Sequence, residues 1–125
     1  MVRCQVAELV WAKIQELVNR CFSLIPSQQQ ITFSSDTIMF QNLSIVKDKN
    51  NRQAIREIIY IAKHVLYRCR FRENRHNMLR IKVVLINISF EIDKLISTRV
   101  FANKRIALLN DFVGLLKDFL GLNNT

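Results

Sequence analysis

The residues best suited to chemistry in this sequence are basic and aromatic side chains that alternate at helical spacing. Steps of four and three residues separate them, which at about 100° per residue places them on one narrow stripe of a helix. They are Arg56, Tyr60, Lys63, Tyr67 and Arg70. Basic side chains neutralise phosphates, and aromatic rings stack on unpaired bases. The stripe therefore predicts contact with RNA or single-stranded DNA. The alternative is a solvated helix face with tyrosines at the core boundary.

The positive charge of the chain is concentrated in one segment. The 125 residues include 19 Lys and Arg against 10 Asp and Glu, a net charge of +9. Residues 47–82 hold eleven of the basic residues and three of the acidic ones, so eight of the nine net charges lie there. Further basic residues in this segment are expected to extend the binding surface: Arg52, Arg68, Arg72 and Arg75. Docking on an acidic membrane is disfavoured, because this helix lacks a separate apolar face with bulky insertion residues.

The sequence offers little for catalysis or metal binding. Its three cysteines, Cys4, Cys21 and Cys69, lie far apart and are expected to be reduced thiols of an intracellular protein, in the nucleus or the cytoplasm. No Cys-x-x-Cys or His-x-x-x-His pair is present, so we expect no metal site and no cofactor. Two glycines cannot build a phosphate-binding loop, and the candidate catalytic side chains do not converge. The sequence therefore predicts that the chain is not an enzyme.

Helices must position the stripe, because the chain has almost no helix breakers. Two Gly, one Pro and a half-hydrophobic composition predict a single all-α domain over residues 1–125, a compact bundle of three long helices plus one short helix. Apolar residues at three- and four-residue steps place helices at 3–25, 51–72, 78–97 and 100–120, with a short helix at 36–41. No apolar run approaches the ~18–20 residues of a membrane span, so no membrane partner is expected.

Some local features leave alternatives open. The alternation of Ile31 and Phe33 suits an extended segment as well as the approach to a short helix. Residues 83–90 are rich in β-branched side chains and resemble a buried strand, although their length and apolar stripe favour a helix. Asn50 or Asn51 is the expected N-cap of the helix over 51–72. Trp11 has apolar neighbours at helical spacing and is expected to be a core anchor.

Two segments resemble a known protein family. Cys4 is followed after six residues by Trp11 and an amphipathic helix, and residues 58–70 combine an apolar pair, Ala-Lys and a basic end. In order and spacing they are similar to the region that follows the polymerase in non-LTR (LINE-type) retrotransposon reverse transcriptases. The resemblance covers residues 1 to about 120. Members of this family reverse-transcribe their own RNA at a nicked target, so it implies a C-terminal helical tail that helps to hold RNA or target DNA.

The resemblance also implies roles for individual residues. Lys63, Arg68 and Arg70 match the basic positions of the family's helix, and Cys4 matches the last member of a Cys/His cluster whose other members are missing here. The adjacent Asp pair of the family's polymerase is missing too. What is implied is a tail, whether a fragment, a decayed copy or a stand-alone reading frame, with the remainder of a polymerase protein as its partner.

Two functions from different classes are predicted. The first is a non-catalytic nucleic-acid-binding accessory segment with weak sequence preference. The second is a helical protein–protein interaction module that docks through apolar surface. An exposed apolar patch around Trp11, Phe22 and Phe40 favours the second function. A continuous positive ridge along residues 51–72 favours the first.

Overall fold

Four long helices make up most of the described part of the chain. The computed structural model describes residues 5–23, 30–34, 37–38, 43, 46–68, 77–98 and 103–122. The helices are α1 (Gln5–Phe22), α3 (Lys49–Arg68), α4 (Asn77–Ser97) and α5 (Asn103–Leu120). The predicted all-α bundle is confirmed: the described residues form four long helices, one for each of the four long ranges predicted, although the predicted total was three. Residues 83–90 belong to α4, so the strand alternative is wrong.

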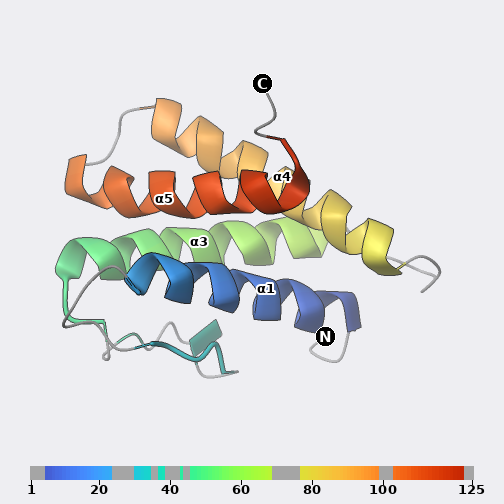
Figure 1. Cartoon of the computed structure of the whole chain (residues 1–125), viewed down its shortest axis with the longest axis horizontal. Coiled ribbons are helices and arrows are strands. Elements are labelled where there is room, and N and C mark those ends of the chain that lie inside the picture. Colours follow the sequence, from blue (N-terminus) through green and yellow to red (C-terminus); the bar gives the residue numbers. More distant parts are fainter. Residues whose placement is uncertain are drawn as a thin grey trace.

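The chain reverses direction from each of these helices to the next. In Figure 1, α1, α3 and α5 run close to parallel lines and α4 crosses them obliquely. Helices α4 and α5 are central, because they pack against each other and each also packs against α1 and α3. Residues 30–34 lie below α1 in the same view, on the path that leads to the start of α3.

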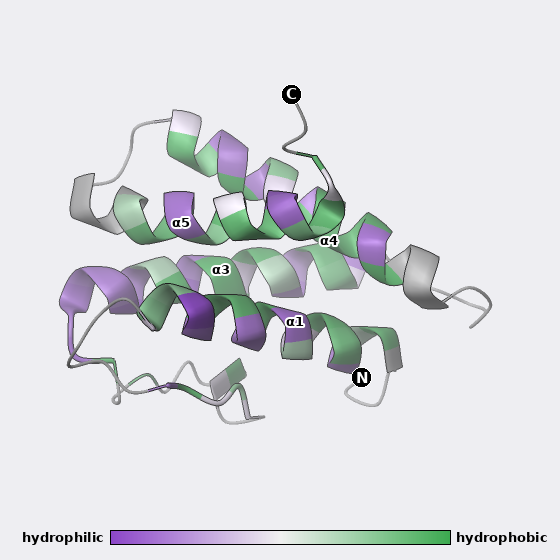
Figure 2. Cartoon of the chain, viewed as in Figure 1, coloured by the Kyte–Doolittle hydropathy of each residue, from purple (hydrophilic) through white to green (hydrophobic). Residues whose placement is uncertain are grey.

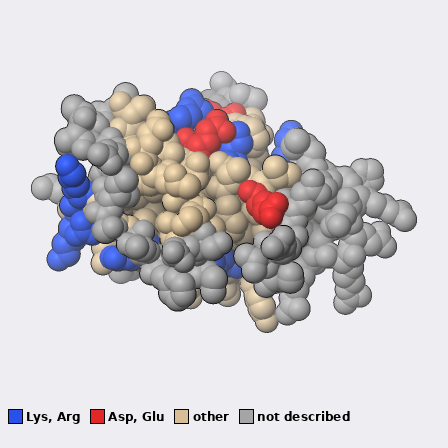
Figure 3. Space-filling model, turned by 90° about the horizontal axis from the view of Figure 1, so that it is seen from below, with Lys and Arg blue, Asp and Glu red and all other residues tan. Residues whose placement is uncertain are grey.

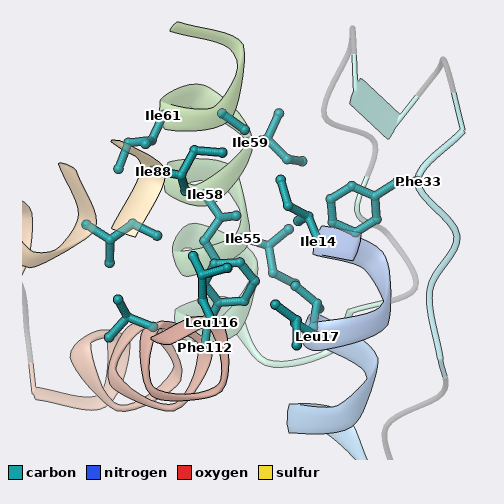
Figure 4. Close-up of a cluster of buried hydrophobic side chains, with 14 of the residues drawn as sticks. Ile14, Leu17, Phe33, Ile55, Ile58, Ile59, Ile61, Ile88, Phe112 and Leu116 are labelled. Atoms are coloured by element: carbon teal, nitrogen blue, oxygen red, sulfur yellow. The ribbon is translucent and has the colours of Figure 1, made fainter. Parts of the chain in front are cut away.

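Apolar residues on the inward helix faces form one core. In Figure 4, Ile55 and Ile58 of α3 lie close to Phe112 and Leu116 of α5, and Ile14 of α1 lies close to Phe33. Helix α3 has six fully buried residues on one face: Ala54, Ile55, Ile58, Ile59, Ala62 and Val65. Each fully buried isoleucine or valine contributes about 1.5–3 kcal/mol to folding. Across the described residues, none of the helices combines the length and apolar character that a bilayer crossing needs.

The start of α3 and the end of α5 each have a defined cap. Asp48, and neither of the predicted asparagines, caps α3, because its carboxylate accepts a 2.8 Å hydrogen bond from the Asn50 N–H. Helix α5 ends at Gly121, whose φ of 75° is costly for other residues. There the Leu122 N–H donates to the Lys117 carbonyl at 2.8 Å, and the Gly121 N–H donates to the Asp118 carbonyl at 3.2 Å. These two bonds form a Schellman motif and satisfy carbonyls at the end of the helix.

The segment after α1 is extended where it can be described. Ile31 and Phe33 are buried and Thr32 between them is exposed, so the extended alternative is correct for residues 31–33. Residues 37–38 are helical, and the other residues of the predicted helix at 36–41 lie outside the described ones. Ser34 precedes this turn, and its hydroxyl accepts a 3.3 Å hydrogen bond from the Thr37 N–H. The short helix is therefore described only at its first turn.

Side-chain amides of α1 hold this extended segment. Asn19 donates from Nδ2 to the Ile31 carbonyl at 2.9 Å and accepts from the Ile31 N–H at 2.8 Å. Gln15, one turn earlier, accepts from the Phe33 N–H at 2.7 Å. The Phe33 ring lies against Trp11, with centroids 6.2 Å apart. Trp11 therefore packs against the core, as predicted for a core anchor, but it is only partly buried, beneath the chain's own segment.

Candidate nucleic-acid interface

The outward face of α3 carries the predicted stripe. Tyr60 and Tyr67 are among the most exposed large side chains described, at 63% and 67% of their full accessible area. Arg56 and Lys63 are half-buried beside them. The same helix buries its isoleucines on the opposite side, so the packing that forms the core also fixes the direction of this stripe. Four predicted site residues are thus brought onto one face: Arg56, Tyr60, Lys63 and Tyr67.

The charge of α3 is strongly positive. The helix contains five Lys and Arg and one acidic residue, Glu57. Figure 2 shows hydrophilic residues along its first turns, and Figure 3 shows Lys and Arg side chains gathered at the end of the molecule where α3 begins. Such clustering on one element creates a local positive potential that attracts polyanions.

Arg56 and Lys63 keep their charges available. Within the described residues neither side chain forms an ion pair or a hydrogen bond. Their half-buried stems lie along the helix surface, and a long basic side chain in this situation places its charged end in water. Both groups can therefore contact a phosphate without first breaking a pair to any described residue.

Arg52 and Arg68, in contrast, have partners inside the protein. Arg52 donates from Nη1 to the carbonyls of Val46 and Lys47, at 2.7 and 3.0 Å, and so fastens the approach to α3. Arg68 reaches Glu91 of α4, with 3.4 Å between Nη2 and Oε2. The Arg68 pair is exposed and its geometry is loose, so it contributes little and can exchange for a phosphate.

Three predicted site residues lie outside the described residues: Arg70, Arg72 and Arg75. The same holds for Cys4, Cys69 and Phe40, and their predicted roles stay predictions.

His64 is a candidate that the sequence reasoning missed. It is exposed and its ring is nearly parallel to that of Tyr60, with ring centroids 6.3 Å apart and 6° between the ring planes. Its position four residues after Tyr60 is the signal that could have revealed it, because residues at this spacing are neighbours on a helix. The interface therefore contains a third aromatic ring between the two tyrosines.

The other groups that could do chemistry are placed elsewhere. Cys21 is a free, buried thiol of α1, and burial with the nearby Asp111 carboxylate raises its pKa to about 11. Such a thiol stays protonated at neutral pH and is a poor nucleophile. Among the described residues, no three His, Cys, Asp or Glu side chains lie close enough to share a metal ion. A hollow of about 520 Å³ between α1 and α5 is lined by Arg20, Asp111 and Asp118, away from the α3 stripe.

The patch proposed for protein docking is not formed by the residues that can be described. Phe22 is fully buried in the core and Trp11 is half-covered by Phe33. Exposed apolar side chains occur at other positions, among them Leu9 of α1 and Phe119 of α5, at 43% and 40%. Lys13 lies one turn after Leu9 on α1, and its Nζ lies 4.1 Å from the Phe119 ring centroid.

Comparison of the chain with protein-family models, curated proteins and solved structures finds no match.

Proposed function

We propose that this chain is a non-catalytic module that binds RNA or single-stranded DNA with weak sequence preference. The observation that carries the proposal is the exposed stripe on α3, where two basic side chains without an ion pair among the described residues alternate with two exposed tyrosines. The resemblance to the tail of LINE-type reverse transcriptases supports the same role, since Lys63 and Arg68 match basic positions of that family's helix. In that setting the module holds RNA or target DNA for a polymerase.

The mechanism is electrostatic capture followed by stacking. Arg56 and Lys63 neutralise phosphates and release counterions, which supplies most of the affinity. Tyr60 and Tyr67 offer ring faces to unpaired bases, and every base has such a face. Arg68 adds a third phosphate contact when it leaves Glu91. Contacts of this kind fix position without reading base edges, so little sequence preference is expected.

The salt dependence of binding tests the proposal. Each phosphate contact to a single strand gives a log–log salt slope of about −0.7. The double variant Arg56→Gln, Lys63→Gln should therefore flatten the slope for a single-stranded oligonucleotide by about 1.4. A charge-matched control, Arg20→Gln with Lys117→Gln, removes two basic residues from α1 and α5 and should leave the slope close to that of the parent protein.

The outcome separates the stripe from general surface charge. Equal flattening by both double variants would mean that overall charge, and not the α3 stripe, attracts the strand. Absence of binding by the parent protein at low salt would reject the proposed function as a whole.

Protein docking through apolar surface is the second candidate. Leu9 and Phe119 are exposed next to the seam between α1 and α5, and they are the observation that favours it. This candidate replaces the first if the parent protein binds no oligonucleotide while Leu9→Gln with Phe119→Gln abolishes association with the remainder of a polymerase protein.

A further inference from the structure

Tyr60 and His64 form a pair of parallel aromatic plates on the exposed face of α3. Four residues of helix rise by about 6 Å. The two ring centroids are 6.3 Å apart and the planes differ by 6°. The rings therefore project from successive turns of α3, and the distance between their centroids matches the rise of the helix over four residues.

The distance between the two ring centroids is close to the separation that a slot for one nucleobase needs. Stacked bases are about 3.4 Å apart, so a base held between two rings needs about 6.8 Å between their planes. The planes of Tyr60 and His64 are at most as far apart as their centroids, so they must open slightly to admit a base. Both side chains are exposed, and rotation about their side-chain bonds provides this opening.

The surroundings of the pair suit the backbone of a nucleic-acid strand. Lys63 precedes His64 directly, and Arg68 follows it by one turn. Helix α3 carries one acidic residue, Glu57, and Glu91 of α4 is engaged by Arg68 and by Lys94, at 3.4 and 3.5 Å. A base between the two rings thus has basic side chains within reach of its flanking phosphates.

We propose that Tyr60 and His64 clamp one unpaired base of a bound strand, with His64 acting as an aromatic plate. This inference rests on the proposed function and adds a binding residue and a substrate requirement to it. A duplex keeps its bases stacked and paired and cannot fill the slot without local opening. The module therefore prefers a single strand to a duplex of equal length, beyond what charge alone would give.

The test uses a single strand that carries one fluorescent base analogue, 2-aminopurine, whose emission falls when it stacks on an aromatic ring. The parent protein should quench this emission in the single strand and much less in the matching duplex. Tyr60→Leu and His64→Ala should each weaken single-strand binding by at least about fivefold and remove the quenching. His64→Phe should retain both, because it keeps the ring and loses the ionisable group.

Matched measurements keep the outcomes distinct. Phe90→Ala removes another exposed ring, from α4, and should bind and quench like the parent. The salt slope should be unchanged in all four variants, since the phosphate contacts remain. Parent-like binding by both Tyr60→Leu and His64→Ala would overturn the clamp and leave the proposed function standing. Failure of His64→Phe to bind like the parent would overturn it too, by assigning the effect to the imidazole charge. No binding by the parent would remove both proposals.

Discussion

Helices α1 and α3 each carry a stripe of aromatic and polar side chains beside their apolar face, but the stripe on α1 is covered and the stripe on α3 is exposed. On α1 the stripe is Trp11, Gln15 and Asn19, and the chain's own extended segment covers it. On α3 the stripe of Arg56, Tyr60, Lys63 and Tyr67 stays open, with its tyrosines about two-thirds exposed.

The difference shows what distinguishes a structural polar face from an available one. The side-chain amides of Gln15 and Asn19 form hydrogen bonds with backbone groups of residues 31 and 33, so these bonds are already made before any external partner binds. Arg56 and Lys63 form no side-chain hydrogen bond or ion pair with the described residues. A polar stripe is therefore a candidate interface only when its hydrogen-bonding capacity is left over after folding.

The largest effect should come from contrasting the two faces of α3 at adjacent positions. Ile59 is fully buried and Tyr60 is exposed. Ile59→Ala should lower the free energy of unfolding by about 2–5 kcal/mol, while Tyr60→Ala should change it by less than about 0.5 kcal/mol. Chemical denaturation followed by circular dichroism measures both. A large loss for Tyr60→Ala would show that the open face is part of the core.

Replacing Trp11, on the covered stripe of α1, should have the next largest effect on the free energy of unfolding. A fully buried Trp→Ala change costs about 3–5 kcal/mol, and partial burial under Phe33 reduces this to about 2 kcal/mol. Phe33→Ala should remove a similar amount, and the double variant should cost less than the sum because the two rings contact each other. Strictly additive losses would argue that the segment is not held against Trp11.

The amides of the covered stripe should have a smaller effect. Asn19→Ala leaves the Ile31 N–H and carbonyl without their side-chain partner, which should cost about 1–2 kcal/mol. Gln53→Ala on α3 is the matched control, since this half-buried amide has no hydrogen bond within the described residues, and its cost should be below about 0.5 kcal/mol. Equal losses at the two positions would erase the distinction between the stripes.

Local sequence pattern was sufficient for the fold and for the direction of the α3 face. The spacing of Ile55, Ile58 and Ile59 determines which side of the helix is buried, and a strictly local period can show that. The helix limits were close for α4, predicted at 78–97 and found at Asn77–Ser97. The cap of α3 was missed, because Asp48 competes with two asparagines that are also good caps.

What covers a face could not be predicted in the same way. Asn19 and Gln15 bind residues 12 and 18 positions away, and no local period encodes that pairing. The partial cover over Trp11 and the internal use of Arg52 both follow from such contacts. The sequence therefore predicted which residues of α3 face outward, but it did not separate arginines that serve the fold from those left over.

Two arginines on α3 test this distinction, and their replacement is expected to change the free energy of unfolding least. Arg52→Gln loses two bonds from a charged group to the carbonyls of Val46 and Lys47, so it should cost about 1 kcal/mol of stability. Arg68→Gln loses only an exposed 3.4 Å pair with Glu91 and should cost less than about 0.5 kcal/mol.

The salt slope of strand binding should rank these two variants in the reverse order. Arg68 can release Glu91 and contact a phosphate, so Arg68→Gln should flatten the slope by about 0.7. Arg52 is held by two carbonyls, and its replacement should leave the slope unchanged. The opposite result would be a flatter slope for Arg52→Gln and an unchanged slope for Arg68→Gln. It would mean that an arginine with internal hydrogen bonds binds the strand, so internal hydrogen bonding would not distinguish a structural face from a binding face.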